Sequence, residues 1–260
     1  PTSDGTSEVG EWIAQNVTAT AADPTFGTVS LNVFKASSKI VAVPFELLQD
    51  SNIDVEGFVR NRLAQRLGRL GNTAFTVGTG TTQPDGVVPK ATSGKVGTTG
   101  QTTTIIYDDV IDLIHSVDPA YRSSACIFMT NDALVKVLRK LKDSQNMPIW
   151  LPNRNAGIAV SGADPGGGYA APNVAQTFDT LLGYPLFINN DIATPAANAK
   201  TMLFGNFSYY KIRDAMEVSM FRFTDSAYTK LGQVAFLAWC RMGGNLLDTN
   251  AVKYYAHSAT

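Results

Sequence analysis

The sequence predicts an α+β fold, because strand patterns and helix patterns occupy separate stretches of the chain. Near the start, residues 28–34 alternate polar and apolar side chains, and residues 39–43 are rich in β-branched ones. A long helical pattern follows residue 54, and a second strand-rich stretch closes the chain after residue 217. Between these, residues 105–214 alternate short helix and strand patterns.

Composition limits the classes of protein that this chain can belong to. Its 260 residues include 21 Lys and Arg against 22 Asp and Glu, 17 % are charged, and 44 % are hydrophobic. That is too apolar for a disordered chain and too evenly charged for a basic protein that coats DNA. The length suggests one or two domains. A surface with so little charge is typical of a chain that is covered by copies of itself.

Two cysteines, Cys126 and Cys240, lie far apart within apolar runs, which indicates buried thiols; a disulfide or a metal site is the alternative. No apolar run reaches the roughly 18–20 residues of a membrane span, and no signal segment is recognisable at the start. We therefore expect no membrane association. The first residue is Pro1, so we expect a processed product or part of a longer chain.

The first elements should form a long β-hairpin arm. Strand-like runs at 12–18 and 28–34 flank a loop at 22–27 that contains Pro24 and Gly27. An isolated two-stranded ribbon is marginally stable in water, so such an arm needs another surface to lie on.

The longest helix should begin near Val55, after possible N-caps between Asp50 and Asp54. Apolar residues recur every three or four positions as far as Phe75. On the other side, a stripe at i, i+4 and i+7 is formed by Arg62, Arg66 and Arg69. This stripe is either a solvated face or a contact with an acidic neighbour or with enclosed nucleic acid.

Residues 78–104, rich in Gly and Thr, predict an exposed loop and a domain boundary. Beyond it we expect a helix from Asp108, a buried strand at 125–129, a helix at 133–141, an irregular stretch at 142–177 and strands at 186–188 and 201–204. In the tail we expect strands at 217–223, 233–240 and 251–256, with a tight hairpin turn at Gly243-Gly244.

Residues for catalysis are scarce. The two histidines, His115 and His257, lack a second His at ligand spacing, and no Gly-x-Ser-x-Gly or phosphate-binding loop occurs. Asp108, Asp109 and Asp112 could hold a divalent ion, but acids at a helix start are far commoner. We therefore predict no catalytic residue, no cofactor and no metal, and a protein that is not an enzyme.

The order of segments resembles the major capsid proteins of tailed double-stranded-DNA bacteriophages, which have the Hong Kong 97 fold. The segments that carry the resemblance are 10–15, 23–27, 43–51, the long helix, 78–80 with 83–86, 204–207, 241–244 and 248–253. Each segment alone is a weak indication of the family, but their occurrence in the same order over most of the chain is specific to it.

The resemblance implies a Hong Kong 97-type α+β capsid fold with three parts. Residues 1–43 would be the extended β-hairpin loop, which lies over a neighbouring subunit. Residues 44–101 and 215–260 would be the peripheral domain with its long spine helix, and 102–214 the axial domain.

The function implied is that of a major capsid subunit, a structural protein of the virion. It would self-assemble, as hexamers and pentamers, into an icosahedral shell that encloses double-stranded DNA without sequence-specific binding. A decoration protein, a portal and a scaffold are possible partners, and assembly would take place in the cytoplasm of the bacterial host. The inter-subunit contacts that we expect are Trp12, Phe26 and Phe34 on the arm and Arg62, Arg66 and Arg69 on the helix.

The chain departs from the family pattern at the positions of covalent cross-linking. Some members join a lysine of the extended loop to an asparagine of a neighbour, assisted by a glutamate. Here no Lys precedes Lys35, and residues 224–244 contain neither Asn nor Glu. We therefore expect a shell without covalent cross-links. The alternatives are a gene-transfer-agent capsid, an encapsulin shell that encloses protein cargo, and an α+β enzyme with an unrecognised site.

Overall fold

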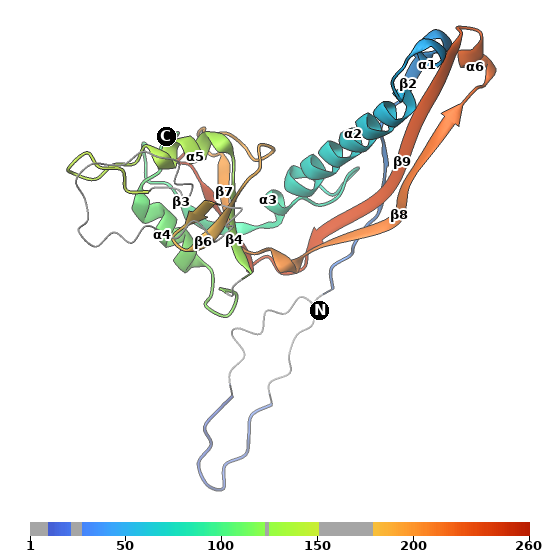
Figure 1. The fold of residues 1–260 in the computed structure, drawn as a ribbon. Helices are drawn as coiled ribbons and strands as arrows, with labels where there is room; N and C mark the ends of the chain where they lie inside the picture. The colour runs from blue at the N-terminus through green and yellow to red at the C-terminus, as the bar shows by residue number, and fades with distance from the viewer. Residues whose placement is uncertain (1–9, 22–27, 123–124, 151–178) are drawn as a thin grey trace, which may run out of the picture. The chain divides into compact units, whose positions relative to one another are not determined.

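The computed structural model describes residues 10–21, 28–122, 125–150 and 179–260, and it divides the chain into two units (Figure 1). The first unit comprises residues 1–90 and 209–249, and the second comprises residues 91–208 and 250–260. The expected ranges placed 91–101 and 250–260 with the long helix. The structure assigns both to the second unit, because strands β3 (Thr92–Val96) and β10 (Val252–Ala256) pair with each other in that unit's sheet.

The first unit is built on one long antiparallel strand pair. Strands β8 (Tyr210–Phe223) and β9 (Gln233–Leu246) have 14 residues each, and the short helix α6 (Ser226–Thr229) lies between them in sequence. Along the other edge of β9 lie β1 (Phe34–Ser37) and β2 (Val41–Pro44), both antiparallel to it. Ser38 lies between β1 and β2 in the chain. Its side-chain Oγ accepts a hydrogen bond from the backbone amide of Ala238 at 2.8 Å.

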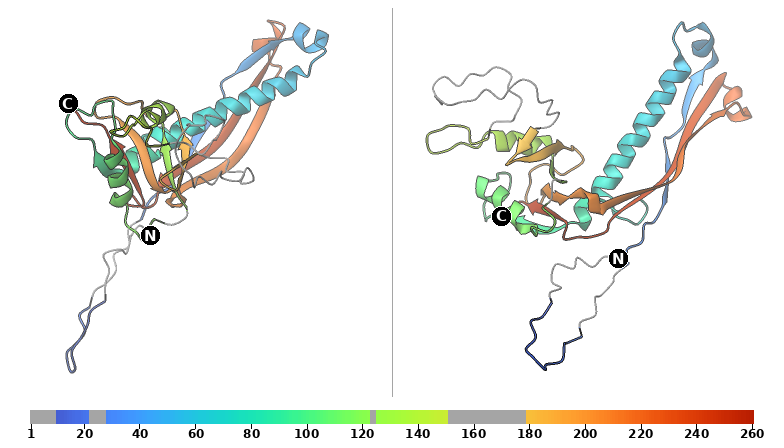
Figure 2. Two further views of the ribbon diagram at one scale, coloured as in Figure 1. Left: turned by 60° about the vertical axis from the view of Figure 1, so that its left-hand side comes forward. Right: turned by 60° about the horizontal axis from the view of Figure 1, so that its bottom comes forward.

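The long helix predicted from the sequence is α2 (Val55–Val77), and it packs on this sheet (Figure 2). Its first turn is capped by Asp54, whose carboxylate accepts a hydrogen bond from the Gly57 amide at 2.8 Å. The three- and four-residue spacing of its apolar side chains lays one stripe on β9. The core of the unit consists of Val59, Leu63 and Leu67 of α2 with Val43, Val234, Phe236, Ala238 and Cys240. In the chain, the short helix α1 (Phe45–Asp50) precedes α2, and the short helix α3 (Val87–Lys90) follows it.

The hairpin turn expected at Gly243-Gly244 is wrong, because β9 runs straight through both residues. A Cβ added at Gly243 would lie 2.0 Å from the Asn32 carbonyl oxygen, and one at Gly244 would lie 2.6 Å from the Tyr210 hydroxyl. Because glycine has no Cβ, these two positions allow neighbouring groups to approach the strand closely.

The described part of the arm contains no strand ladder. Residues 10–21 form an extended segment with a turn, in which the Thr20 amide and hydroxyl both donate to the Glu11 carboxylate. Residues 28–33 also lack a strand partner, although the side-chain amide of Asn245 donates to the Ser30 carbonyl oxygen. The strands expected at 12–18 and 28–34 are thus absent from the described residues, apart from Phe34 in β1, which pairs with β9. A two-stranded ribbon gains too little by itself to form there.

The second unit is a six-stranded mixed sheet in the order β3-β10-β7-β4-β6-β5. The strands expected in the centre of the chain are confirmed as β4 (Cys126–Thr130), β6 (Tyr184–Ile188) and β7 (Lys200–Asn206), and β5 (Asp179–Leu181) lies at the edge. The expected helices are α4 (Tyr107–Ser116) and α5 (Asp132–Arg139), the latter capped by Asn131. A 3-10 turn, Phe207–Tyr209, follows β7.

The core of this unit includes Phe128, Phe204 and Tyr255, all fully buried. The loop expected at 78–104 contains the unit boundary, but it also contains α3 and β3. Most of the irregular stretch expected at 142–177 lies outside the described residues. Cys126 and Cys240 are buried free thiols, as predicted. Among the described residues, no helix is long and apolar enough to cross a membrane.

Candidate assembly surfaces

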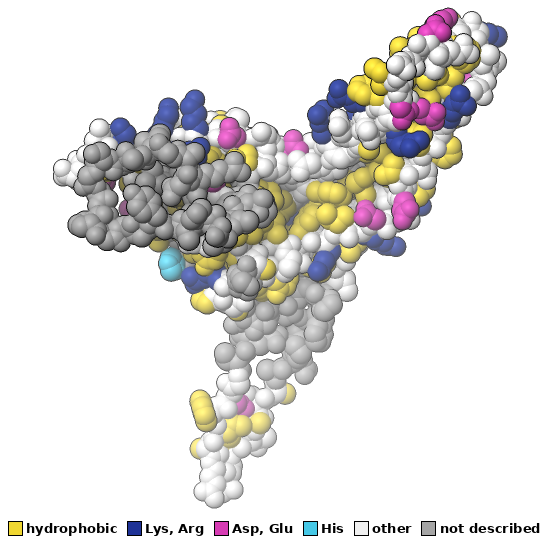
Figure 3. Space-filling model, viewed as in Figure 1, with side chains coloured by type: hydrophobic (Ala, Val, Ile, Leu, Met, Phe, Trp, Pro, Cys, Tyr) yellow, Lys and Arg dark blue, Asp and Glu magenta, His cyan; other side chains and the backbone are white. Residues whose placement is uncertain are grey.

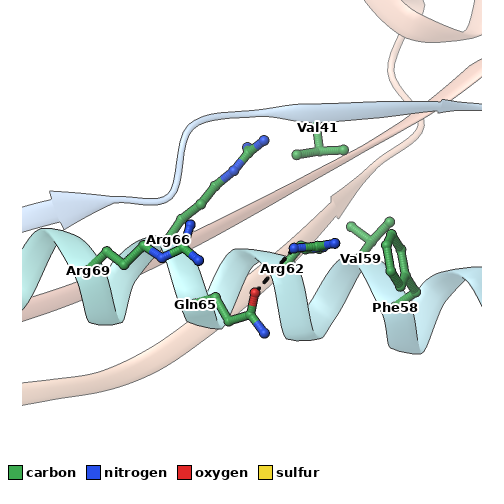
Figure 4. A pocket seen from close by; sticks show the side chains of 7 residues that line it. All are labelled: Val41, Phe58, Val59, Arg62, Gln65, Arg66 and Arg69. Atoms are coloured by element: carbon green, nitrogen blue, oxygen red, sulfur yellow. Dashed lines mark hydrogen bonds between the residues drawn. The ribbon is translucent and has the colours of Figure 1, made fainter.

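The arginine stripe of α2 borders a groove between the helix and the β1–β2 edge. A hollow of about 410 Å³ is lined by Val41, Phe58, Val59, Arg62, Gln65, Arg66 and Arg69 (Figure 4). A neighbouring hollow of about 650 Å³ shares Arg66 and Arg69 and adds Ser37, Ser38, Lys39, Ile40, Leu70 and Thr73. We refer to the two hollows together as the arginine groove. The structure thus brings the three predicted arginines together and adds Lys39, which the sequence reading did not include.

The positive charge of the arginine groove is not neutralised within the described part of the subunit. The Arg62 guanidinium lies over the Phe58 ring, 5.1 Å from its centroid, and donates to the Gln65 side-chain oxygen at 3.5 Å. No Asp or Glu lines either hollow. The ion pairs found in the described residues lie elsewhere, at Lys90 with Asp85 and at Lys95 with Asp109 and Asp112. Arginines with no carboxylate partner among the described residues are available to an external anion.

The predicted aromatic contacts of the arm are not gathered at one place. Trp12 is fully exposed, at 104 % of its reference area, and Ile13 and Val17 nearby are also exposed. Phe34 is half-buried in β1 and borders a hollow of about 240 Å³ together with Leu70 of α2. Phe26 lies outside the described residues. Among the described residues of the arm, Trp12 therefore leaves a large apolar side chain for a partner to cover.

A second apolar surface was missed by the sequence reading. Alternate residues of β9 face α2, so those between them face the opposite side of the sheet. On that side a hollow of about 480 Å³ is lined by Lys35, Met216, Phe221, Phe223, Trp239 and Arg241, which we call the aromatic sheet face. The rings of Phe221 and Phe223 stack with centroids 6.4 Å apart. The alternation of residues 217–223 was the signal that could have revealed it.

The remaining polar groups of interest are internal. His257 is buried, with Nε2 at 3.1 Å from the Thr201 hydroxyl and Nδ1 at 3.2 Å from the Gln101 carbonyl oxygen. Burial lowers the pKa of His257 below its usual value. Asp109, considered as a metal ligand, is buried beside Lys95 and accepts a hydrogen bond from the Tyr255 hydroxyl at 3.5 Å. Within the described ranges, no group of three His, Cys, Asp or Glu side chains could hold a metal ion.

The fold is thus an α+β architecture whose described surface carries one arginine-rich groove and one apolar hollow. The family model described as the phage capsid family matches residues 1–256, and the chain belongs to that family. Among curated protein sequences, no significant match is found.

Solved structures with a similar fold include the capsids of two GTA particles and structures from phages. The capsid of a native GTA particle is 24 % identical with a TM-score of 0.77, and that of an empty GTA particle is 25 % identical with a TM-score of 0.75. Each alignment covers 96 % of this chain and 81 % of the other. The structure of Gordonia phage Cozz is 14 % identical, with a TM-score of 0.63 and coverage of 95 % and 80 %. The Hong Kong 97-type α+β fold expected from the sequence is thereby confirmed.

Proposed function

We propose that this chain is the major capsid subunit that self-assembles into the icosahedral shell of a tailed bacteriophage and encloses its double-stranded DNA genome. The observation that carries the proposal is the match of the phage capsid family to residues 1–256, nearly the whole chain. The collinear order of the segments in the sequence and the two α+β units support it.

The proposal gives each unit of the chain a place in the capsid fold. We assign the first unit to the peripheral domain with α2 as its spine helix, the second unit to the axial domain around five- and six-fold centres, and the arm to the extended loop. Each contact between copies can be modest, because closure of a shell multiplies it over many identical interfaces.

The partners follow from the same assignment. Copies of the chain would form hexamers and pentamers, and a decoration protein, a portal and a scaffold would complete the particle. The near-zero net charge of −1 suits a wall that encloses DNA without gripping it, since tight phosphate contacts would oppose packing and release. The protein would belong to the virion and assemble in the cytoplasm of the bacterial host, with a shell held by non-covalent contacts.

Electron cryo-microscopy of the chain produced in a bacterial host tests the proposal. We expect closed icosahedral particles built from hexamers and pentamers of this subunit. A protein that remains a discrete 27.9 kDa monomer at high concentration, with no large assembly by sedimentation, would overturn it.

A second candidate function is the capsid of a gene-transfer agent, which packages host DNA. The two GTA capsids, with TM-scores of 0.77 and 0.75 against 0.63 for the phage Cozz structure, are the observation that raises this candidate, but a likeness of fold does not place it above the phage. Sequencing of the packaged DNA separates the two. One defined genome in every particle supports the phage, whereas fragments from all parts of a host chromosome support the gene-transfer agent.

A further inference from the structure

Charge changes sign at one point along the chain, within the first turns of α2. Residues 40–59 contain four acidic side chains and no Lys or Arg, whereas residues 60–77 contain four arginines and no Asp or Glu. The acidic residues are Glu46, Asp50, Asp54 and Glu56; the arginines are Arg60, Arg62, Arg66 and Arg69. Two adjoining stretches thus carry formal charges of −4 and +4, although the chain as a whole is almost neutral.

The acidic stretch forms one end of the first unit, made by α1 and the start of α2. Glu46, Asp50 and Asp54 are exposed there. Apolar side chains share this surface, because Leu47 is 51 % exposed and Ile53 is 76 % exposed. Figure 3 shows acidic and hydrophobic side chains at the end that carries α1 and α6, with some basic side chains beside them. We call the residues Glu46, Leu47, Asp50 and Ile53 the acidic end.

The arginine groove has the complementary character. Its cations lie beside exposed apolar side chains, since Phe58 is 56 % and Leu70 is 45 % exposed. The floor of the groove includes Val41 of β2. A ligand that combines carboxylates with aliphatic side chains would satisfy both the charge and the apolar area of this surface.

Along α2, the acidic residue that caps the helix lies well short of the arginine groove. Asp54 and Arg62 are eight residues apart on one continuous helix, which separates them by about 12 Å along the axis. An ion pair requires a separation of about 4 Å or less. Consistent with this, no ion pair joins the two stretches within the described residues. Glu56 and Arg60 are one helical turn apart and can attract each other within one copy, whereas the Glu46 and Asp50 carboxylates remain available to a second copy.

We propose that the acidic end of one copy docks in the arginine groove of a second copy. The contact pairs the Glu46 and Asp50 carboxylates with the Arg62 and Arg66 guanidinium groups and covers Leu47 and Ile53 against Phe58 and Val41. Because every copy carries both halves, the contact can either close about a two-fold axis or repeat from copy to copy. The inference rests on the proposed function, in that it describes one contact within a shell of this subunit.

A charge-reversal series tests the pairing. The variants are Arg62→Glu with Arg66→Glu, Glu46→Lys with Asp50→Lys, and all four changes in one chain. We expect each double variant to weaken association of the subunit about tenfold or more, and the fourfold variant to restore most of it. Sedimentation velocity at two ionic strengths measures the association, and wild-type association should weaken as salt rises.

Controls separate a lost contact from a lost fold. Arg60→Glu is the matched variant, because Arg60 is exposed on the same helix but does not line the groove, and it should associate as the wild type does. Circular dichroism and thermal unfolding should be unchanged in all variants, since the mutated side chains are exposed. If the fourfold variant is unfolded, the neutral pair Glu46→Gln with Arg62→Gln replaces it in a double-mutant cycle, in which non-additive losses support the pairing.

The outcomes are distinguishable from failure of the shell function itself. Normal particles from both double variants would overturn the docking and leave the shell function intact, as would a folded fourfold variant that does not regain association. Normal particles with reduced nucleic acid from the arginine variant alone would also overturn the docking, because the groove would then bind a polyanion. Absence of any assembly by the wild type would instead overturn the proposed function.

Discussion

The Lys35 ammonium lies 4.0 Å from the centroid of the Trp239 ring, and the contact joins β1 to β9 on the sheet face that α2 does not cover. The two residues are diagonal neighbours in the register, because Lys35 pairs with Arg241 and Ser37 pairs with Trp239. Lys35 is exposed and Trp239 is half-buried, so the cation remains partly hydrated.

This contact should stabilise the β1 edge modestly. In a double-mutant cycle of Lys35→Met and Trp239→Leu, we expect a coupling of about 0.5–1 kcal/mol in the free energy of unfolding, measured by urea denaturation. Because the pair is partly exposed, the coupling should shrink in high salt. A coupling of zero at low salt would show that the contact contributes nothing.

His257 should make the stability of the second unit depend on pH. Burial lowers its pKa from the ordinary 6.5, so the native state binds a proton less readily than the unfolded chain. The stabilisation that this group contributes is therefore fully present above pH 6.5 and is lost progressively as the pH falls below that value toward the native pKa.

The measurement is urea unfolding across this range in the wild type and in His257→Gln. We expect the free energy of unfolding of the wild type to fall more steeply on acidification than that of the variant. Asp109, whose charge opposes the shift, remains in both proteins, so the difference reports on His257. Identical slopes would contradict the prediction.

Two glycine substitutions should have opposite effects. Gly243→Ala places a Cβ against the backbone oxygen of Asn32, and we expect a loss of about 1–3 kcal/mol because strand and neighbouring segment must move apart. Gly68→Ala lies on the exposed side of α2 with no atom within 4 Å, and we expect a gain of about 0.5–1 kcal/mol. Thermal unfolding of the two variants tests both signs, and a neutral Gly243→Ala would show that the approach of residue 32 is easily relaxed.

These cases show which parts of the fold were predictable from sequence. The start of α2 at Val55 and the buried strand at Cys126 were found because periodicity and apolar runs act over a few neighbouring residues. The pair Gly243-Gly244 was misread because a glycine pair is equally suited to a tight turn and to a strand that another backbone approaches closely. Only the packing partner, residue 32, decides between them.

Of the candidate surfaces, the arginine stripe could be predicted from the sequence and the aromatic sheet face could not. Arg62, Arg66 and Arg69 share a helix face by local spacing alone, so the sequence was sufficient to group them. The aromatic sheet face joins Lys35, Phe221 and Trp239, which are distant in sequence. Their meeting depends on the register of β8 and β1 on β9, which includes irregularities between Asp214 and Met216 and between Met216 and Ser219. No local pattern specifies such a register.

The absence of cross-linking residues leads to a prediction for denaturing gels. No Lys precedes Lys35 in this sequence, and residues 224–244 lack both Asn and Glu, so the side chains expected to form the isopeptide bond of some family members are missing from these stretches. Particles boiled in detergent should run as a single band at the mass of one subunit. A ladder of linked subunits would contradict this, and mass spectrometry of the ladder would identify the bond.

Trp12 should matter for assembly and hardly at all for folding. Its side chain is fully exposed, so Trp12→Ala should change the free energy of unfolding by no more than about 0.5 kcal/mol. A buried tryptophan contributes about 150–250 Å² of contact area, and its loss from an interface should weaken association about tenfold or more. Gln15→Ala, an exposed change in the same segment, is the control and should assemble normally.

Shortening the arm between Ala19 and Thr28 should likewise leave a folded subunit that assembles poorly. If Trp12→Ala and the shortened chain both form particles at the wild-type rate and yield, then the arm does not hold neighbouring subunits together.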